Sequence, residues 1–165
     1  CQITGTTESY SSEIPEPFSF IPEKQRSIKL SDGSITSPFL DLYGRPPRDT
    51  GYESERNNTP SSEQKLHMLN SSHIQRKIVN NKALFGMYYK KPEKGAKGKN
   101  KKPAVAWHPP EKVLEGMYLT ILSRYPTAKE KRTVLEYFHS TNNRFNAAVD
   151  VAWALLNTKE FIYKH

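Results

Sequence analysis

The C-terminal third of the chain carries an apolar pattern that predicts helices. After the sequence WHPP, apolar residues recur every three to four positions and place one stripe along a helix that ends before Pro126: Val113, Leu114, Met117, Ile121, Leu122 and Tyr125. Thr127 and Glu130 then form a T-x-x-E capping box, which starts a second helix carrying Val134, Leu135 and Phe138. Two helices are therefore expected to meet at one tight turn.

A third helix is expected from about Phe145. It is apolar nearly all round, so we expect it to be the buried helix of the three, with Trp153 inside the core: Ala147, Ala148, Val149, Val151, Ala152, Trp153, Ala154, Leu155 and Leu156. Residues 111–165 are therefore predicted to form a three-helix unit.

Residues 1–58 follow a different pattern. Proline and other turn-forming residues interrupt short apolar runs such as FSFIP and SIKL every few positions. We expect extended or loop structure here, with one or two short strands.

The pattern becomes helical over residues 59–84. Thr59 is expected to cap a helix that has Pro60 at its first position, and Leu66 and Leu69 share one face of that helix. The polar sequence NSS at residues 70–72 predicts a break and restart before the next apolar pair, Ile74 and Ile78.

Together these patterns predict a mainly α-helical fold. The proline-rich N-terminal half is expected to pack on a small helical bundle that ends in the three-helix unit, and residues 1–165 are expected to form one domain. The apolar fraction of 35% and the mean hydropathy of -0.77 are low for a self-contained globule, so we expect this domain to be a fragment of a larger one.

The positive charge of the chain is concentrated in one segment. Residues 90–102, KKPEKGAKGKNKK, carry six of the eight net positive charges. Such a segment suits nucleic acid or another polyanion, and Tyr88, Tyr89 and Trp107 flank it as candidates for stacking on bases, but it contains no arginine. Its composition favours an exposed, lysine-rich loop over residues 88–110, and a nucleic-acid-binding module is the third of our functional hypotheses.

Few patterns typical of catalytic or metal sites occur. The single cysteine, Cys1, excludes an internal disulfide and any paired-cysteine metal or haem motif. The histidines lack the spacing of a metal-binding helix, and no P-loop, dinucleotide-binding or serine-hydrolase motif is present. We therefore expect no metal and no cofactor in this chain, and no apolar run approaches the roughly 20 residues of a membrane span.

The densest paired charge lies in residues 44–64, GRPPRDTGYESERNNTPSSEQ. One interpretation makes Glu53 and Glu55 a catalytic acid/base or nucleophile pair, with three arginines that bind an anionic substrate: Arg45, Arg48 and Arg56. The alternative is a structural tie, in which the arginines donate to carbonyl groups and the carboxylates accept from amides near the helix start. Because no histidine lies nearby in the sequence to complete a catalytic set, we favour the structural tie and lean against an enzyme.

Residues 43–71, YGRPPRDTGYESERNNTPSSEQKLHMLNS, also match a family pattern in which a FGRP element leads through CECER into a P-[ST]-x-x-Q-x-L-x-x-LN helix. The matching residues are Gly44, Arg45, Pro46, Glu53, Glu55, Arg56, Leu66, Leu69 and Asn70. Together with residues 117–138 and 147–165, this stretch resembles the C-terminal domain of unknown function of planctomycete and verrucomicrobial exported proteins that also carry cytochrome-c-like domains. Tyr52 and Ser54 replace the cysteines of that family.

The resemblance covers essentially the whole chain, including CQITG at its start, so it implies that residue 1 is internal to a longer protein. It implies an extracytoplasmic bacterial location, in the periplasm, at the cell surface or outside the cell, with any haem on another domain of the parent protein. We therefore expect an interaction or scaffold module whose partners are the remainder of the parent polypeptide or other envelope subunits. The alternative is part of an enzyme or binding domain that acts on anionic, sulfated polysaccharide.

Overall fold

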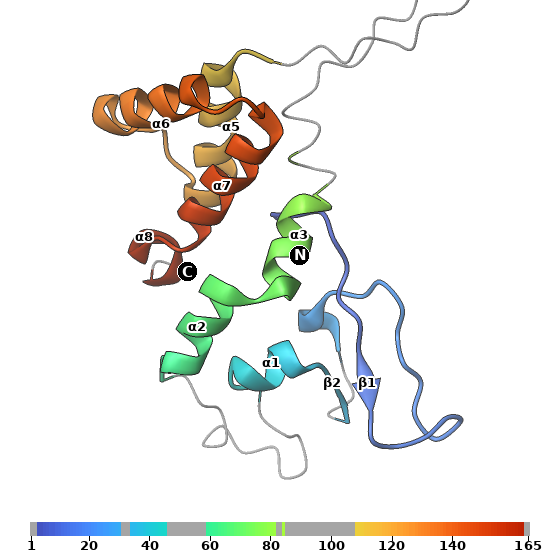
Figure 1. Ribbon diagram of the computed structural model, residues 1–165. Helices are drawn as coiled ribbons and strands as arrows, with labels where there is room; N and C mark the ends of the chain where they lie inside the picture. The colour runs from blue at the N-terminus through green and yellow to red at the C-terminus, as the bar shows by residue number, and fades with distance from the viewer. Residues whose placement is uncertain (1–2, 31–33, 46–58, 82–83, 85–107, 164–165) are drawn as a thin grey trace, which may run out of the picture. The chain divides into compact units, whose positions relative to one another are not determined.

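The computed structural model describes residues 3–30, 34–45, 59–81, 84 and 108–163 (Figure 1). These residues are mainly α-helical, as the sequence predicted. They fall into two compact units. The N-terminal unit contains residues 6–71, and the C-terminal unit contains residues 2–5 together with residues 72–165.

The N-terminal unit contains the short strands expected of its irregular sequence. Strand β1 (Ser11–Ser12) pairs antiparallel with β2 (Ile35–Thr36), and Ser11 lies opposite Thr36. The 3-10 helix η1 (Ser27–Lys29) lies between the strands in sequence, and helix α1 (Pro38–Leu42) follows β2. The Ser37 hydroxyl caps α1 by accepting from the Leu40 N–H, and Pro38 occupies the first turn, where it removes no helical hydrogen bond.

Helix α2 (Ser62–Asn70) begins two residues later than predicted. Its cap is Ser61 and not Thr59, because Ser61 and Gln64 form a reciprocal capping box that satisfies two backbone donors. The helix ends at Asn70, which confirms the predicted break. Leu66 and Leu69, which the sequence placed on one face of this helix, are 56% and 39% exposed.

The C-terminal unit begins with helix α3 (Ser72–Val79), whose Ile74 and Ile78 are buried. Three helices follow the lysine-rich segment: α5 (Pro110–Leu122), α6 (Ala128–Ser140) and α7 (Arg144–Leu156). They pack against one another, and α3 packs on α7 (Figure 1). A short fourth helix that the sequence did not predict, α8 (Lys159–Tyr163), packs on α5 and α7.

The core of this unit lies between α5 and α7. Its buried members from these helices include Val113, Leu114, Met117, Tyr118, Ile121, Ala147, Ala148, Val151, Ala152, Leu155 and Leu156. Three alanines on α7 allow close helix approach, since they carry no side chain beyond Cβ. Polar Asn81 is also fully buried, because its amide donates to the Ile3 carbonyl and accepts from the Leu84 N–H.

Two expected core residues do not belong to this core. Trp153 is only half-buried, because the buried face of α7 is centred on its alanines and Trp153 lies at the margin of that face. Tyr125 is 67% exposed, because α5 ends at Leu122 and Ser123 turns the chain in the left-handed conformation (φ 55°).

Some expectations lie outside these observations. Residues 85–107, which include most of the predicted lysine-rich loop, are not among the described residues. The packing of the N-terminal half on the helices and the single-domain organisation stay predictions. None of the described helices has the length and apolar character needed to cross a membrane.

Candidate functional site

The arginine-rich segment predicted from the sequence is described only at its margins. Arg48, Glu53, Glu55 and Arg56 lie outside the described residues, so the structure does not bring the candidate carboxylates together or separate them. Arg45 is half-buried, and its backbone N–H donates to the Leu40 carbonyl at 3.0 Å. Gly44 (φ 78°) supplies the left-handed residue that closes α1, as glycine does without strain.

The two ends of this segment are held together by Gln64. Its side-chain amide donates to the Leu42 carbonyl at 3.0 Å, and its backbone carbonyl accepts from the Tyr43 hydroxyl at 3.2 Å. Beside these bonds Phe39, Tyr43 and His67 form an aromatic cluster with ring centroids 4.5 to 6.3 Å apart. Burial raises the pKa of Tyr43 above its usual value. Two hydrogen bonds of Gln64 therefore join the described ends of the segment, and the tie made by arginines stays a prediction.

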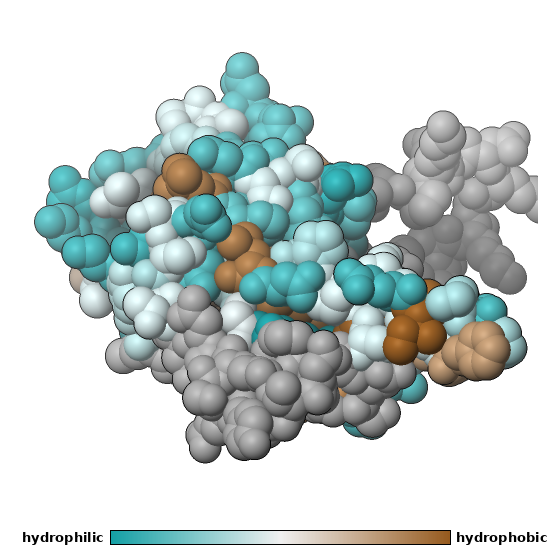
Figure 2. Space-filling model, turned by 90° about the horizontal axis from the view of Figure 1, so that it is seen from below, coloured by the Kyte–Doolittle hydropathy of each residue, from teal (hydrophilic) through white to brown (hydrophobic). Residues whose placement is uncertain are grey.

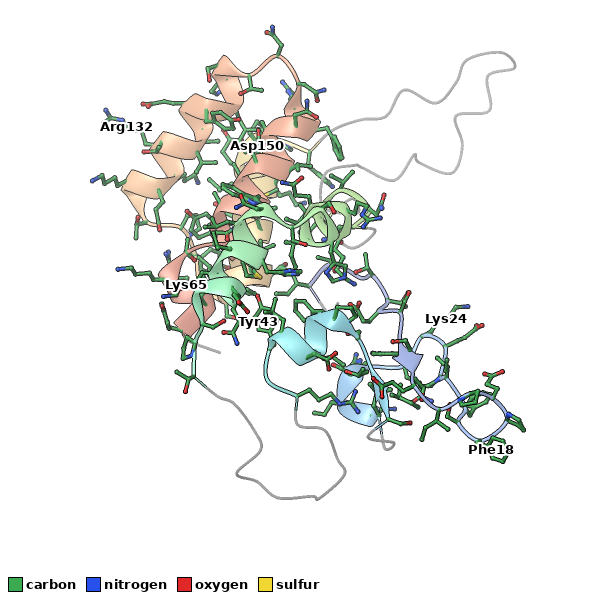
Figure 3. All side chains as sticks on the ribbon, turned by 60° about the horizontal axis from the view of Figure 1, so that its bottom comes forward. Phe18, Lys24, Tyr43, Lys65, Arg132 and Asp150 are labelled. Carbon is green, nitrogen blue, oxygen red and sulfur yellow. The ribbon has the colours of Figure 1, made fainter. Side chains whose placement is uncertain are left out.

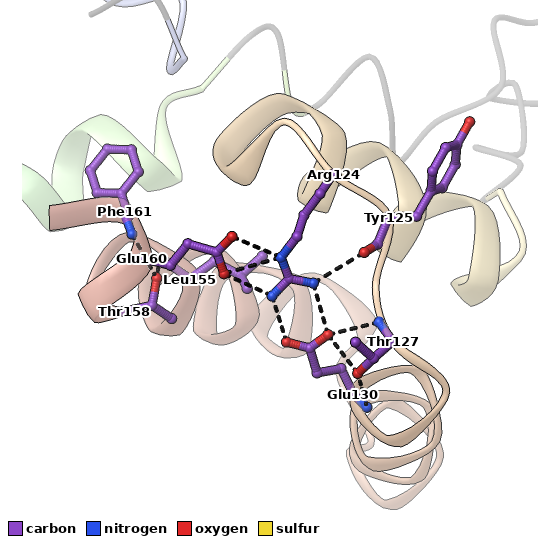
Figure 4. A network of polar contacts seen from close by, with 8 residues as sticks. All are labelled: Arg124, Tyr125, Thr127, Glu130, Leu155, Thr158, Glu160 and Phe161. Atoms are coloured by element: carbon purple, nitrogen blue, oxygen red, sulfur yellow. Dashed lines mark hydrogen bonds and ion pairs between the residues drawn. The ribbon is translucent and has the colours of Figure 1, made fainter. Parts of the chain in front are cut away.

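The densest ionic network among the described residues surrounds Arg124, just after α5 (Figure 4). The guanidinium donates from Nη1 and Nη2 to both oxygens of Glu130 at 2.9 and 2.8 Å. It donates from Nε and Nη2 to Glu160 at 2.9 to 3.0 Å, and from Nη1 to the Tyr125 carbonyl at 3.1 Å. Every guanidinium nitrogen of Arg124 is therefore engaged inside the chain.

The charges in this network reinforce one another. The hydrogen bonds that Arg124 donates to Glu130 and Glu160 raise the pKa of Arg124. The same contact with Arg124, helped by Thr127, lowers the pKa of Glu130 to about 2. The guanidinium also lies 5.3 Å from the ring centroid of Tyr118, whose pKa is raised by burial and by Glu130. The network suits a structural clamp, because the guanidinium of Arg124 is fully engaged by groups of the chain and leaves no free donor for a substrate.

Of the residues in this clamp, the sequence predicted only the contact between Thr127 and Glu130. The capping box of Thr127 and Glu130 was predicted and is confirmed, since the Thr127 hydroxyl accepts from the Glu130 N–H at 3.3 Å. Arg124 lies three residues before the box, a local signal that could have been noticed. Glu160 is 36 positions away from Arg124, so no local pattern relates the two.

The N-terminal unit exposes unusual apolar groups in residues 13–20, here called the apolar loop. Phe18 and Phe20 are 83% and 78% exposed, while Ser19 between them is only 4% exposed. The Ser19 hydroxyl donates to the Ile14 carbonyl, and the Phe18 N–H donates to the Pro15 carbonyl at 3.1 Å, so the turn is closed internally. Phe18 stands at the tip of this loop in Figure 3, and Figure 2 shows apolar groups that break the hydrophilic surface.

A second feature, here called the basic hollow, lies farther along the segment between β1 and β2. It is open to solvent, has a volume of about 710 Å³ and is lined by Lys24, Gln25, Arg26 and Lys29. Lys24 has a left-handed backbone (φ 57°), which is uncommon for a residue with a Cβ. The hollow therefore gathers three cationic side chains within six residues.

Metal ligation has no candidate in the described ranges, since no group of three or more His, Cys, Asp or Glu side chains lies close enough to hold an ion. The expectation of no metal and no cofactor stays a prediction.

Comparison with known proteins gave no match to a family model, to a curated protein or to a solved structure. The resemblance to the planctomycete and verrucomicrobial domain therefore rests on the sequence motifs alone.

Proposed function

We propose that this chain is an interaction or scaffold module of a larger exported cell-envelope protein, without chemistry of its own. The observation that carries the proposal is the inverted burial in the apolar loop, where two phenylalanines face solvent and the serine between them is buried. In a self-contained fold this order is reversed, because burying a large apolar side chain is worth about 1.5 to 3 kcal/mol.

The local structure explains why these rings do not turn inward. Phe18 and Ser19 lie in a turn in which both of their N–H groups donate to the Pro15 carbonyl. This turn buries Ser19 and leaves Phe18 and Phe20, on either side of it, exposed. The bond from Ser19 to Ile14 keeps the loop in this arrangement. Exposed aromatic residues on a pinned turn suit an interface, since such side chains supply much of the binding energy between proteins.

The occupant that we propose is another polypeptide with an apolar pocket edged by cationic side chains. Glu13 and Glu16 are exposed on either side of Pro15, next to the aromatic pair, so the apolar loop presents negative charge around apolar surface. A complementary rim of lysine or arginine on the partner would steer the encounter and select the partner. The location at the cell envelope rests on the resemblance of residues 43–71, 117–138 and 147–165 to exported proteins.

A site-specific crosslink tests this proposal. A photoreactive phenylalanine analogue is placed at Phe18 in the full-length protein in its own cells, with Tyr125, an exposed aromatic residue of the C-terminal unit, as the matched control position. We expect position 18 to crosslink to one polypeptide that position 125 does not capture. That polypeptide, once purified, should bind Phe18→Ser/Phe20→Ser at least about tenfold more weakly than the unchanged chain. Equal affinities, or no adduct specific to position 18, would contradict the proposal.

The alternative, action on an anionic polysaccharide, needs its own test because its candidate residues lie outside the described ranges. Glu55→Gln and Arg56→Ala are compared with the unchanged chain for melting temperature and for binding of a sulfated oligosaccharide. A structural tie predicts lower melting temperatures, because removing one partner strands the other charge. Unchanged melting temperatures with lost binding would favour the polysaccharide hypothesis over the scaffold.

A further inference from the structure

We propose that the basic hollow binds the sulfate or carboxylate groups of an acidic polysaccharide. The proposal is independent of the apolar loop, since it rests on different side chains and a different ligand chemistry. It starts from the open hollow lined by Lys24, Gln25, Arg26 and Lys29.

The backbone around the hollow is held in place. Pro22 before it and Leu30 after it are buried, and the Tyr10 hydroxyl donates to the Gln25 carbonyl at 2.9 Å. Lys24 keeps a left-handed conformation that costs about 1 to 2 kcal/mol for a residue with a Cβ. Strain of this kind is concentrated at ligand-binding positions, and Figure 3 shows the Lys24 side chain pointing away from the chain.

The cationic side chains of the hollow form no ion pair with a carboxylate of the described residues. Lys24, Arg26 and Lys29 are all exposed. Glu23 precedes Lys24 but does not line the hollow. In contrast, Arg124 in the C-terminal unit is paired with two carboxylates, those of Glu130 and Glu160. Three exposed cations around one depression attract a multivalent anion.

The lining residues indicate which polyanion fits. Binding of single-stranded nucleic acid relies on aromatic rings that stack on bases, and no aromatic side chain lines the hollow. The planar fork of Arg26 matches the oxygens of sulfate or carboxylate, and the flanking lysines add point charges. The side-chain amide of Gln25 can donate to a sugar hydroxyl or ester oxygen. This combination of side chains suits an acidic polysaccharide whose charged groups and hydroxyls make the contacts.

Titration of the full chain with dextran sulfate tests the proposal, with uncharged dextran as the control ligand. In ¹H–¹⁵N spectra we expect the amides of residues 24–29 to shift with dextran sulfate and not with dextran. Calorimetry should give at least about tenfold weaker binding for Lys24→Gln/Arg26→Gln/Lys29→Gln. The matched control Lys112→Gln/Lys129→Gln/Lys159→Gln removes the same charge from exposed positions on α5, α6 and α8, and should weaken binding at most about twofold.

Both triple variants keep residues 90–102, so the contribution of that lysine segment cancels in the comparison. Equal weakening by the two variants would overturn the proposal, because net charge alone would then explain the affinity. The absence of amide shifts at residues 24–29 would overturn it even if the hollow variant failed to fold. Equal affinity for a single-stranded oligothymidylate, with the same shifts, would overturn the assignment to a polysaccharide.

Discussion

Arg124 and Glu130 face one another through two parallel hydrogen bonds, from Nη1 to Oε2 at 2.9 Å and from Nη2 to Oε1 at 2.8 Å. Glu160 binds the same guanidinium from α8, so one arginine joins the turn after α5 to the start of α6 and to the C-terminal helix. Bidentate pairs of this kind are stronger and more directional than ordinary surface ion pairs. The contribution of this ion pair to stability can therefore be measured separately from that of the capping box.

Glu130→Gln is expected to lower the free energy of unfolding at neutral pH by about 1 to 2 kcal/mol, because a third of each side chain is exposed and solvent screens the pair. Glutamine can still complete the capping box, so the loss reports the ion pair and not the cap. Urea unfolding measures the change. Glu136→Gln removes the partner of Arg132 in an exposed pair of α6 and serves as the control, with an expected loss below about 0.5 kcal/mol.

The pH dependence of the clamp follows from the lowered pKa of Glu130. Its pKa falls from an ordinary 4.5 to about 2 in the folded chain, so the folded state holds the carboxylate ionised where the unfolded state takes up a proton. This stabilisation is complete above pH 4.5 and is lost as the pH falls toward 2. We expect the difference in unfolding free energy between the unchanged chain and Glu130→Gln to shrink over that interval. A difference that stays constant with pH would contradict the assignment.

Ser123→Gly should raise the free energy of unfolding by about 1 kcal/mol, because Ser123 adopts the left-handed conformation (φ 55°) that glycine tolerates best. Lys129→Gly, placed in the exposed first turn of α6, is the opposite control and should cost up to about 1 kcal/mol. Thermal unfolding of both variants measures the effect. Destabilisation by Ser123→Gly would show that this conformation carries no strain.

Leu114→Ala should cost about 2 to 5 kcal/mol, because Leu114 is fully buried between helices and its loss leaves a cavity. Trp153→Ala should cost less than the roughly 3 to 5 kcal/mol typical of a buried aromatic residue, since Trp153 is only half-buried. Denaturant unfolding of the two variants ranks them. A larger loss for Trp153→Ala would place that ring in the core after all.

Replacing residues 90–102 with a Gly/Ser linker of equal length should leave the melting temperature nearly unchanged. A segment of lysine, glycine and asparagine has little apolar surface to bury, and the entropy of closing a loop of equal length is the same to a first approximation. Calorimetry of the two proteins checks this. A large fall in melting temperature would mean that these lysines make specific contacts.

Local interactions made much of the helical architecture predictable. The cap at Thr127 and Glu130 spans four residues, and the break between α2 and α3 depends on three polar residues, so both are encoded by neighbours in the chain. The apolar spacing of α5 likewise follows from helix geometry. The start of α2 was misplaced because Thr59 and Ser61 are both good caps, and only the position of Gln64 completes the box at Ser61.

The candidate sites depended on contacts that no short window of sequence contains. The burial of α7 was predicted, but the side of it that faces the core was decided by the neighbouring helices, which left Trp153 at the margin. Glu160 reaches Arg124 across 36 positions. The inverted order of Phe18 and Ser19 runs against the hydrophobic preference of each residue, so only the fold of the loop around Ser19 reveals it. Apolar periodicity and helix capping depend on residues close in sequence. The side of a helix that faces the core, the partners of an ion pair and the exposure of a side chain depend on segments that meet only when the chain has folded.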